Sequence, residues 1–373
     1  MTDTQTIARD DDRAGTEYVA IDADGHVHEE NVMFTEYLEP AFRKHTEGWA
    51  LNADRNRRFI VDGGEHPPFP KEISVRKPMP PDSRIKVLDK ERIRLAVLFP
   101  SAALTAGYME PGLAHAIMRA YNSWMSDWCG RFPDRLKFAA PVALYDIDDA
   151  IREARRAVGE LGAVAISVRP NPAGGKRLDH PDREPFYAAI EELGVPLVIH
   201  ESTGDPSTAG GDRYGGMQTP ESYAFHHVIS HPFEQMMAVM AIVCGGVLAR
   251  HPALKVGFFE AGCSWAPYWL ARLDDHFEHP KLGPYIKDNG LTMRPSEYFQ
   301  RQCVVTCDPG DPTIPLAVQG IGADRILFAT DYPHFDSGAG AVNDFLEVAD
   351  FGDADRRRIL WDNTLAFYGL SPD

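Results

Sequence analysis

Short apolar runs alternate with amphipathic stretches along most of this chain, and this alternation restricts the fold more than any other feature of the sequence. Runs rich in Val, Ile, Phe and Ala, without polar alternation, are typical of strands buried on both faces. We expect strands at Tyr18–Asp24, Leu95–Pro100, Leu136–Val142, Ala163–Arg169, Pro196–His200, Lys255–Glu260, Cys303–Asp308 and Ile326–Asp331. The amphipathic pattern predicts helices that include Gly112–Cys129, Ile147–Leu161, Glu184–Leu193, Phe233–Arg250 and Ala341–Val348.

Strands that alternate with helices indicate parallel βα units with right-handed crossovers. Eight such strands are the number found in a (β/α)8 TIM barrel, so we predict an α/β barrel as one domain over residues 18–373. A doubly wound open sheet is the alternative. Residues 30–90 are polar and proline-rich, and we expect them to form an inserted cap region after strand one. Residues 1–17 predict a flexible acidic tail.

The charge balance limits the kinds of molecule that we expect this protein to bind. The 373 residues include 38 Lys and Arg against 55 Asp and Glu, which gives a formal net charge of −17. Nucleic acids and anionic membranes need clustered basic residues, so we expect neither as a partner. No apolar run approaches the ~18–20 residues of a membrane span. The acidic N-terminus lacks the pattern of a secretory signal, and the five scattered Cys predict no disulfide framework. We therefore expect a soluble cytoplasmic protein.

Ionisable residues stand at the predicted carboxyl ends of several strands, where barrel enzymes place their active sites. Asp24 and His26 are two residues apart on one strand, so they project to the same side. His200 and Asp331 end distant strands and would meet this pair only in a closed barrel. Imidazole and carboxylate ligands suit Zn²⁺, Mn²⁺ or Fe²⁺. A single His or Asp in such a position is more often a cap or a structural residue, but four at matching strand ends favour one divalent metal site.

Four segments resemble a known family. IDADGHVHE, PLVIHEST, GGVLARHPALKVGFFEAG and DRILFATDYPH are similar, in this order, to motifs of the amidohydrolase superfamily. The most similar branch is the amidohydrolase-2, or aminocarboxymuconate-semialdehyde-decarboxylase-like, group, and the resemblance covers about residues 18–370. It implies a (β/α)8 barrel with a mononuclear divalent metal. It also implies nonoxidative decarboxylation of aromatic or unsaturated carboxylic acids, or hydrolysis.

The resemblance assigns roles to individual residues. It implies metal ligation by Asp24, His26, His200 and Asp331, and it gives Asp331 the transfer of the proton as well. Arg272 occupies the place of an arginine that reaches a neighbouring subunit's substrate carboxylate. We therefore expect a homodimer or a higher homo-oligomer. The alternative is a monomer in which Arg272 pairs with a nearby aspartate.

One position departs from the family. Decarboxylating relatives have a histidine at the end of strand six, where this chain has Glu260. Glu260 could act as a metal ligand, a proton shuttle or a hydrogen-bond acceptor for a substrate hydroxyl. His226, His227 and His231 are candidate replacements for the missing histidine; on a helix His227 and His231 would share a face. Alternatively, these three histidines only form a polar cap over the barrel mouth.

Three functions follow from these observations. The first is a metal-dependent decarboxylase of a small carboxylic acid, with Asp331, Glu260 and His227 as catalytic residues. Its substrate-binding residues would be Arg272, His231 and His334, and its cofactor one Zn²⁺, with Mn²⁺ as the competing ion. The second is a hydrolase of an amide, lactone or ring bond, in which the metal lowers the pKa of bound water toward ~7. The third is a barrel without catalytic activity that serves as a binding or assembly protein.

Overall fold

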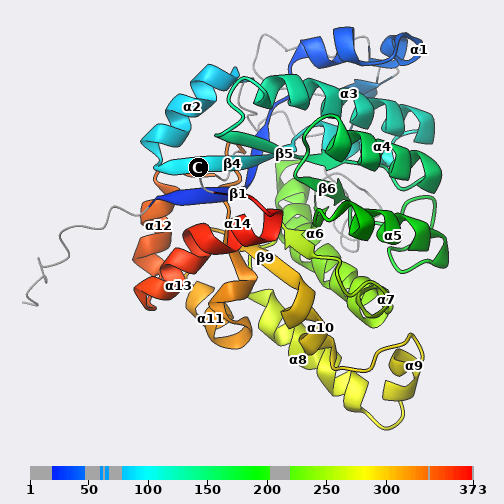
Figure 1. The fold of residues 1–373 in the computed structure, drawn as a ribbon, viewed down its shortest axis with the longest axis vertical. Coiled ribbons are helices and arrows are strands. Elements are labelled where there is room, and N and C mark those ends of the chain that lie inside the picture. The colour runs from blue at the N-terminus through cyan, green and yellow to red at the C-terminus, as the bar shows by residue number, and fades with distance from the viewer. Residues whose placement is uncertain are drawn as a thin grey trace, which may run out of the picture.

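The computed structural model describes residues 19–46, 59–61, 64–66, 78–201, 219–334 and 337–371. Eight parallel strands form one sheet in the order β1-β4-β5-β6-β7-β8-β9-β10 (Figure 1). The strands are β1 (Ala20–Val27), β4 (Ile93–Pro100), β5 (Leu136–Pro141), β6 (Ala165–Val168), β7 (Leu197–His200), β8 (Val256–Phe259), β9 (Cys303–Cys307) and β10 (Ile326–Phe328).

Backbone hydrogen bonds join the first strand to the segment after the last one. The amide of His26 donates to the carbonyl of Tyr332 at 2.8 Å, and the amide of Asp331 donates to the carbonyl of Asp24 at 3.0 Å. The sheet therefore closes into a (β/α)8 TIM barrel. The predicted barrel is confirmed, and the open-sheet alternative is wrong.

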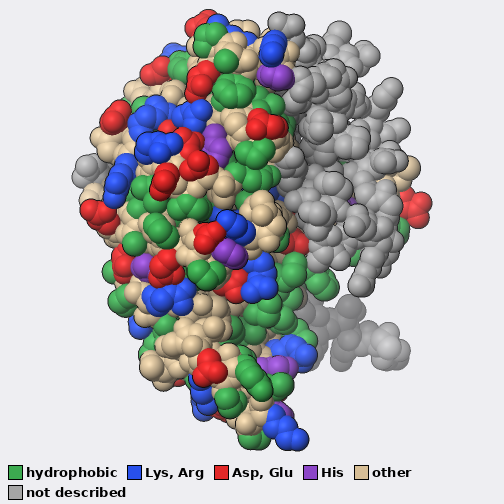
Figure 2. All heavy atoms as spheres, turned by 90° about the vertical axis from the view of Figure 1, so that its right-hand side faces the viewer, with side chains coloured by type: hydrophobic (Ala, Val, Ile, Leu, Met, Phe, Trp, Pro, Cys, Tyr) green, Lys and Arg blue, Asp and Glu red, His purple; other side chains and the backbone are tan. Residues whose placement is uncertain are grey.

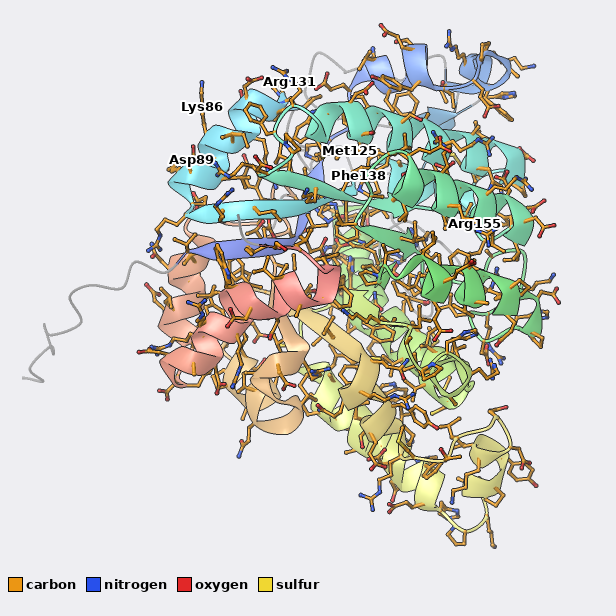
Figure 3. All side chains as sticks on the ribbon, in the orientation of Figure 1. Lys86, Asp89, Met125, Arg131, Phe138 and Arg155 are labelled. Atoms are coloured by element: carbon orange, nitrogen blue, oxygen red, sulfur yellow. The ribbon has the colours of Figure 1, made fainter. Side chains whose placement is uncertain are left out.

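Helices surround the barrel. The longer ones are α2 (Pro81–Lys90), α3 (Pro111–Cys129), α4 (Ile147–Gly159), α5 (Glu184–Leu193), α6 (Pro220–Val239), α8 (Trp265–Glu278), α10 (Pro295–Gln302), α11 (Ile314–Ile321) and α12 (Ala341–Val348). The shorter ones are α1 (Pro40–Arg43), α7 (Val247–Arg250), α9 (Gly283–Lys287), α13 (Asp353–Arg357) and α14 (Asn363–Tyr368). Figure 3 shows the amphipathic arrangement: Met125 on α3 and Phe138 on β5 are buried, whereas Arg155 on α4 points to solvent.

Most predicted elements lie within two residues of the observed ones, and three differ more. The predicted strand Ile326–Asp331 ends too late, because β10 stops at Phe328. The predicted strand Tyr18–Asp24 ends too early, because pairing with β4 continues to Val27. The predicted helix Phe233–Arg250 starts too late. α6 begins at Pro220, where Thr219 caps it, and a π-helical turn, Met240–Cys244, follows before α7.

The region predicted as an inserted cap is partly described. It holds a π-helical turn at Met33–Tyr37, α1, a short 3-10 turn at Lys44–Thr46, and two antiparallel strands, β2 (Phe59–Val61) and β3 (Gly64–His66). Its last ten residues are α2, which precedes β4. Residues 47–58 and 67–77, the predicted tail 1–17 and residues 202–218, which follow β7 and are rich in Gly and Ser, lie outside the described residues.

The hydrophobic core has two layers. The larger layer lies between the strands and the surrounding helices. The smaller fills the barrel with residues from every strand, including Ile21, Val97, Val198 and Leu327, and Phe367 and Tyr368 of α14 close this layer. A packed interior leaves the carboxyl ends of the strands as the place for chemistry.

One helical stretch qualifies as a membrane span by length and composition, contrary to the sequence-based expectation. It runs from Pro220 to Arg250, and 61% of its most apolar window is buried in the protein. In the middle of α6 the buried Gln235 amide donates to the carbonyls of Ile199 and Phe259, which ties the helix to β7 and β8. The stretch therefore has the contacts of a core helix.

Figure 2 shows acidic and basic side chains interspersed on the face that carries α4 and α5. Ion pairs account for several of them: Arg155 lies 3.0 Å from Glu192, and Lys176 and Arg177 pair with Asp182 and Asp179. Lys176 and Arg177, in the loop after β6, therefore have acidic partners close in sequence.

Candidate metal centre

A β-bulge in β1 brings the first two candidate ligands to the inside of the barrel. The pairing with β4 shifts between Asp22 and Gly25, so the alternation of side chains changes phase there. Asp22 and Gly25 both face outward, and Asp24 and His26 face inward. A Cβ on Gly25 would lie 2.6 Å from the Arg84 guanidinium and 2.7 Å from the Asp22 carboxylate, so only glycine fits.

A buried ion pair supports the bulge from outside. The Arg84 guanidinium lies 3.9 Å from Asp22 and donates to the carbonyls of His26 and Tyr332 at 3.3 and 3.0 Å. Asp22 accepts hydrogen bonds from the backbone amide and the hydroxyl of Thr330. Burial, partly offset by Arg84, raises the pKa of Asp22 to about 6. The ion pair joins β1 to the segment that follows β10, beside the site. Sequence reasoning missed it because Arg84 lies in the polar segment before β4, the second strand of the barrel.

Asp24, His26 and His200 meet at one point inside the barrel. Nε2 of His200 lies 3.2 Å from Asp24 Oδ1, and Nε2 of His26 lies 3.6 Å from the same oxygen. Each ring has its Nδ1 next to a backbone carbonyl, Pro100 for His26 (2.9 Å) and Glu201 for His200 (2.6 Å). A carbonyl only accepts, so Nδ1 carries the proton in each neutral ring, and both Nε2 lone pairs face the carboxylate. Such a concentration of acceptors requires a cation or protons.

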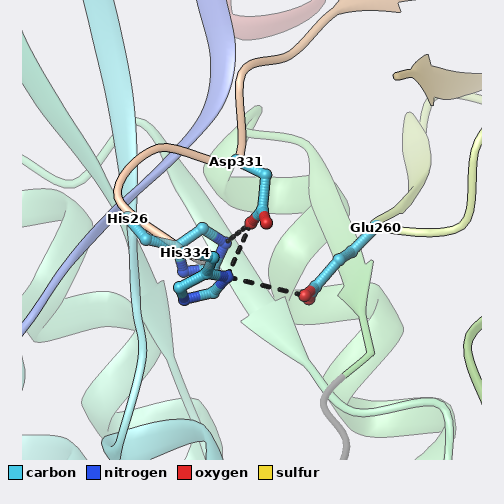
Figure 4. Close-up of side chains that lie close together, drawn as sticks. All are labelled: His26, Glu260, Asp331 and His334. Carbon is cyan, nitrogen blue, oxygen red and sulfur yellow. Dashed lines mark ion pairs between the residues drawn. The ribbon is translucent and has the colours of Figure 1, made fainter. Parts of the chain in front are cut away.

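Asp331 adds a second carboxylate to this group. Its Oδ1 lies 3.2 Å from Nε2 of His26 and 2.7 Å from Nδ1 of His334 (Figure 4). Burial alone would raise the pKa of Asp331, but the His334 and His26 rings hold it well below its usual range. Asp331 is therefore ionised at neutral pH. Its backbone is left-handed, with φ 52°, and this conformation turns the chain away after β10.

Glu260 follows β8 and also has a left-handed backbone, with φ 60°. Three imidazoles surround its carboxylate: Nδ1 of His200 at 3.1 Å, Nε2 of His231 at 3.4 Å and Nδ1 of His334 at 3.8 Å. Burial raises the pKa of Glu260 well above its usual value, since nearby His200 only partly offsets it. Burial also lowers the pKa of His200, but Asp24 and Glu260 outweigh it and raise this pKa to about 9.

His227 and His231 share a face of α6, as the sequence predicted for a helix, and their ring centroids are 4.5 Å apart. Burial, together with the neighbouring ring, lowers the pKa of His227 to about 3. Burial also lowers the pKa of His231, to about 4. Both rings are therefore neutral and can accept or donate a hydrogen bond toward a bound molecule. His226 is fully buried and does not line the cavity beside them.

Sequence reasoning missed the residues that position His334. Its Nε2 lies 2.9 Å from the hydroxyl of Ser101. The carboxylate of Glu29 accepts hydrogen bonds from the amides of Ser101, Ala102 and Ala103 and so fixes the loop that presents this hydroxyl. Glu29 ends the IDADGHVHE motif, so its place next to the His26 segment was an available signal.

A cavity of about 590 Å³ opens beside these groups. Its acidic and imidazole lining residues are Asp24, His227, His231, Glu260, Asp308, Asp311, Asp331 and Asp344. Neither Lys nor Arg lines it among the residues that the structure describes. A substrate carboxylate would therefore need a cation from another source.

Arg272 does not join the site within this chain. It is exposed on α8, and no ion pair to it occurs in the described part of the molecule. The aspartates proposed as its intrachain partners have other contacts. Asp274 accepts hydrogen bonds from Ser296, and Asp275 lies 3.6 Å from His276.

The residues present fit a divalent cation. Nε2 of His26 is fully buried, lacks a hydrogen-bond partner among the described residues and points at two carboxylates. Burial and nearby His334 lower the pKa of His26 to about 4, so this ring presents a lone pair rather than a proton. One potential ligand atom from each of Asp24, His26 and His200 lies within 4.8 Å of the others. Zn²⁺ and similar ions use such mixed imidazole and carboxylate sets.

Comparisons with known proteins identify the family of this chain. The sequence pattern of the family described as Amidohydrolase matches residues 21–370. A 2-amino-3-carboxymuconate-6-semialdehyde decarboxylase of Dictyostelium discoideum is 26% identical over 79% of this chain and 77% of its own length. A gamma-resorcylate decarboxylase of Rhizobium radiobacter is 29% identical over 78% of this chain and 87% of its own length.

Solved structures share the fold. An amidohydrolase from Mycobacterium avium subsp. paratuberculosis superposes with a TM-score of 0.77, at 23% identity, over 96% of this chain and 99% of its own. A dihydroxybenzoic acid decarboxylase from a Polaromonas species, solved with bound manganese and the inhibitor 2-nitroresorcinol, superposes with a TM-score of 0.66. The two sequences are 20% identical, and the superposition covers 94% of this chain and 97% of that structure.

Proposed function

We propose that this chain, which belongs to the amidohydrolase family, is a metal-dependent nonoxidative decarboxylase of a small aromatic or unsaturated carboxylic acid. The observation that carries the proposal is the convergence of Asp24, His26 and His200, with Asp331 beside them, next to a cavity whose described lining contains neither Lys nor Arg. Both curated relatives reported above are carboxy-lyases, which favours a lyase over a hydrolase.

The proposed cofactor is a divalent ion held by Asp24, His26, His200 and Asp331. When bound, it supplies the positive charge that orients a substrate carboxylate and stabilises the negative charge formed in the reaction. Zn²⁺ suits the two imidazoles, and Mn²⁺ competes because two of the four ligands are carboxylates. The manganese in the Polaromonas decarboxylase supports this alternative.

Asp331 is the proposed proton-transfer group. Being ionised, it can take the proton of a hydroxyl next to the substrate carboxylate and pass it to the carbon that bears the carboxylate. The carbon–carbon bond then breaks, its electron pair returns to the unsaturated system, and CO₂ leaves. His334, 2.7 Å from Asp331, holds this carboxylate in place, while His227 and His231 face the substrate from α6.

Hydrolysis is the second candidate, and Glu260 is the observation that favours it. A buried carboxyl group with a raised pKa, next to a metal site, can accept a proton from an attacking water. This route would use Glu260 where the decarboxylating relatives have a histidine.

The assembly we propose is a homodimer in which Arg272 reaches the partner's site. Large apolar side chains are exposed on α6 and on α8, the helix that carries Arg272, and these two helices are in contact. Val228 is 70% exposed, Tyr268 63% and Phe233 52%. Large exposed apolar patches often mark protein–protein interaction surfaces.

One experiment separates the two reactions. The purified protein, loaded with Zn²⁺ or Mn²⁺, is incubated in ¹⁸O-labelled water with hydroxylated aromatic acids, beginning with γ-resorcylate. Release of CO₂ without ¹⁸O in the organic product supports the decarboxylase. Incorporation of ¹⁸O without CO₂ supports the hydrolase, and neither event across the series refutes both for this substrate class.

A further inference from the structure

A second cavity, of about 210 Å³, lies at the amino-terminal end of the barrel. Ile21 and Leu95 line it near the starts of β1 and β4, whereas the candidate metal ligands Asp24 and His26 stand nearer the carboxyl end of β1. Among the residues that the structure describes, this cavity shares no lining residue with the cavity beside the metal centre. A molecule bound here would therefore not touch the candidate metal site.

Apolar side chains form one wall of this cavity. Trp361 precedes α14, Leu365 lies on it and Leu370 follows it, and all three pack partly buried against the inner core layer to which Ile21 and Leu95 belong. Figure 1 shows α14 beside β1, and the two elements are in contact. An apolar cavity of about 150 Å³ can hold a benzene ring. The larger volume here accommodates a ring with one polar substituent.

Lys137 places a cation in this apolar setting. It stands two residues before Ala139 on β5, so the two side chains project from the same face of the strand, and Ala139 belongs to the inner core layer. Lys137 is partly buried and lines the cavity. Within the described part of the chain its ammonium group has neither an ion pair nor a hydrogen bond. Because a desolvated ammonium group is costly without an acceptor, a bound anion would stabilise it.

Two further donors line the same space. The indole N–H of Trp361 has no acceptor among the described residues, although a buried indole N–H usually finds one. The Arg94 guanidinium donates to the backbone carbonyl of Asp134 at 3.0 Å, an acceptor that carries no charge. The Asp134 carboxylate is the one acidic group in the described lining, and it is exposed, so water screens it. Two basic groups therefore face one screened acidic group, in a chain whose net charge is −17.

We propose that this cavity binds a small aromatic carboxylate, with the ring against Trp361 and Leu365 and the carboxylate on Lys137. The apolar wall disfavours inorganic anions, which would gain nothing from it. The two cations disfavour cationic ligands and favour an anion over its neutral analogue. This inference goes beyond the proposed function, because it requires neither the metal ion nor the reaction. The protein would then hold an aromatic acid at both ends of the barrel.

The test measures the binding of radiolabelled benzoate to the full-length, metal-loaded protein by equilibrium dialysis, with and without a chelator. Benzoate held by the metal ion is released by the chelator, whereas benzoate in this cavity remains. We expect one chelator-resistant benzoate per chain. Lys137→Met should weaken this binding roughly 10–100-fold, because it removes a hydrogen bond between charged groups. Leu365→Trp should abolish it by filling the cavity.

Lys86→Met is the matched control, because Lys86 is exposed on α2 (Figure 3), outside the cavity, and should keep the wild-type affinity. Neither acetate, which lacks the ring, nor benzyl alcohol, which lacks the charge, should displace the bound benzoate at equal concentration. Circular dichroism checks that each variant is folded, and if Leu365→Trp does not fold, Lys137→Met and the two competitors still decide the question.

Three results would overturn the proposal: no chelator-resistant binding to the wild type at millimolar benzoate, unchanged binding in the folded Lys137 variant, or displacement by benzyl alcohol as effective as that by unlabelled benzoate. Absence of CO₂ release from any acid would count against the proposed function alone.

Discussion

Glu260 Oε2 lies 3.1 Å from Nδ1 of His200, and this contact joins the carboxyl ends of the neighbouring strands β7 and β8. The same Nδ1 lies 2.6 Å from the carbonyl of Glu201, and this hydrogen bond fixes the ring orientation and directs Nε2 toward Asp24, while the Glu260 carboxylate lies behind the ring. Acceptors behind a metal-binding imidazole raise its basicity and hold its tautomer. Glu260 therefore affects the candidate metal position whether or not it binds an ion itself.

His200→Ala should abolish retention of the proposed metal ion. The substitution removes a nitrogen ligand from a fully buried position and leaves Asp24 and His26 of β1 without the ligand that β7 supplies. Elemental analysis after gel filtration measures the effect. His276→Ala, on the outer helix α8, is the control and should bind as much metal as the wild type. Unchanged metal content in the His200 variant would disprove this ligand assignment.

Asp331→Asn should lower turnover per bound metal by roughly 10²–10⁴, the usual contribution of general acid–base catalysis. The amide keeps one oxygen for a cation but cannot exchange the proton. Initial rates with an acid that the wild type decarboxylates, normalised to metal content, give the measurement. Glu260→Gln should act mainly on KM and retain more turnover. If the Glu260 variant is inactive and the Asp331 variant remains active, Glu260, which follows β8, is the proton-transfer group instead of Asp331.

Gly25→Ala should destabilise the protein by about 1–3 kcal/mol, the usual cost of overpacking a core position. Its Cβ would lie 2.6 Å from the buried Arg84 guanidinium, and relief of that contact would displace the bulge that directs Asp24 and His26 inward. Thermal denaturation and metal content report the two effects. Gly159→Ala, at the end of α4 with no atom within 4 Å of the new Cβ, should instead be neutral or stabilising by up to about 1 kcal/mol. Equal stability changes in the two variants would contradict this role for Gly25.

The sequence predicts the barrel and most of the candidate site for one physical reason. Strands buried on both faces appear as unbroken apolar runs, and closure of a parallel barrel brings their carboxyl ends together. His200 and Asp331 could therefore be associated across more than a hundred residues. The bulge at Gly25 was not predictable, because regular alternation also places Asp24 and His26 on one side. Arg84 and Ser101 act through tertiary contacts whose partners are distant in sequence, and no local pattern indicates them.

The proposed homodimer predicts a particle of twice the 41.5 kDa chain mass in solution. Val228→Glu, at a position 70% exposed on α6, should shift it toward the monomer, because the charge would be buried at the interface. Multi-angle light scattering at micromolar concentration measures the mass. Leu316→Glu, at an exposed apolar position on α11, is the control and should leave the mass unchanged. A wild-type monomer would reject the dimer and with it the role of Arg272 across the subunit boundary.

Acid should destabilise the fold through a cluster far from the metal centre. His251 lies between Glu184 and Glu191, with nitrogen–oxygen distances of 2.9 and 3.0 Å. Burial alone would raise the pKa of both glutamates, but Arg250 and His251 lower the pKa of Glu184, and His251 lowers that of Glu191. A lowered folded-state pKa gives stability that is present above the ordinary value of 4.5 and is lost as the pH falls through the folded value.

His251→Gln should therefore flatten the dependence of unfolding free energy on pH below about pH 5, because the glutamates lose the partner that lowers their pKa. Chemical denaturation of wild type and variant between neutral pH and the acid transition measures both slopes. The carboxylates of the metal centre titrate alike in the two proteins, so the difference between the curves isolates the Glu184–His251–Glu191 cluster. His276→Gln, in a more exposed position on α8, should keep the wild-type slope. Parallel curves for wild type and His251→Gln would show that these pairs do not contribute to the acid sensitivity of the fold.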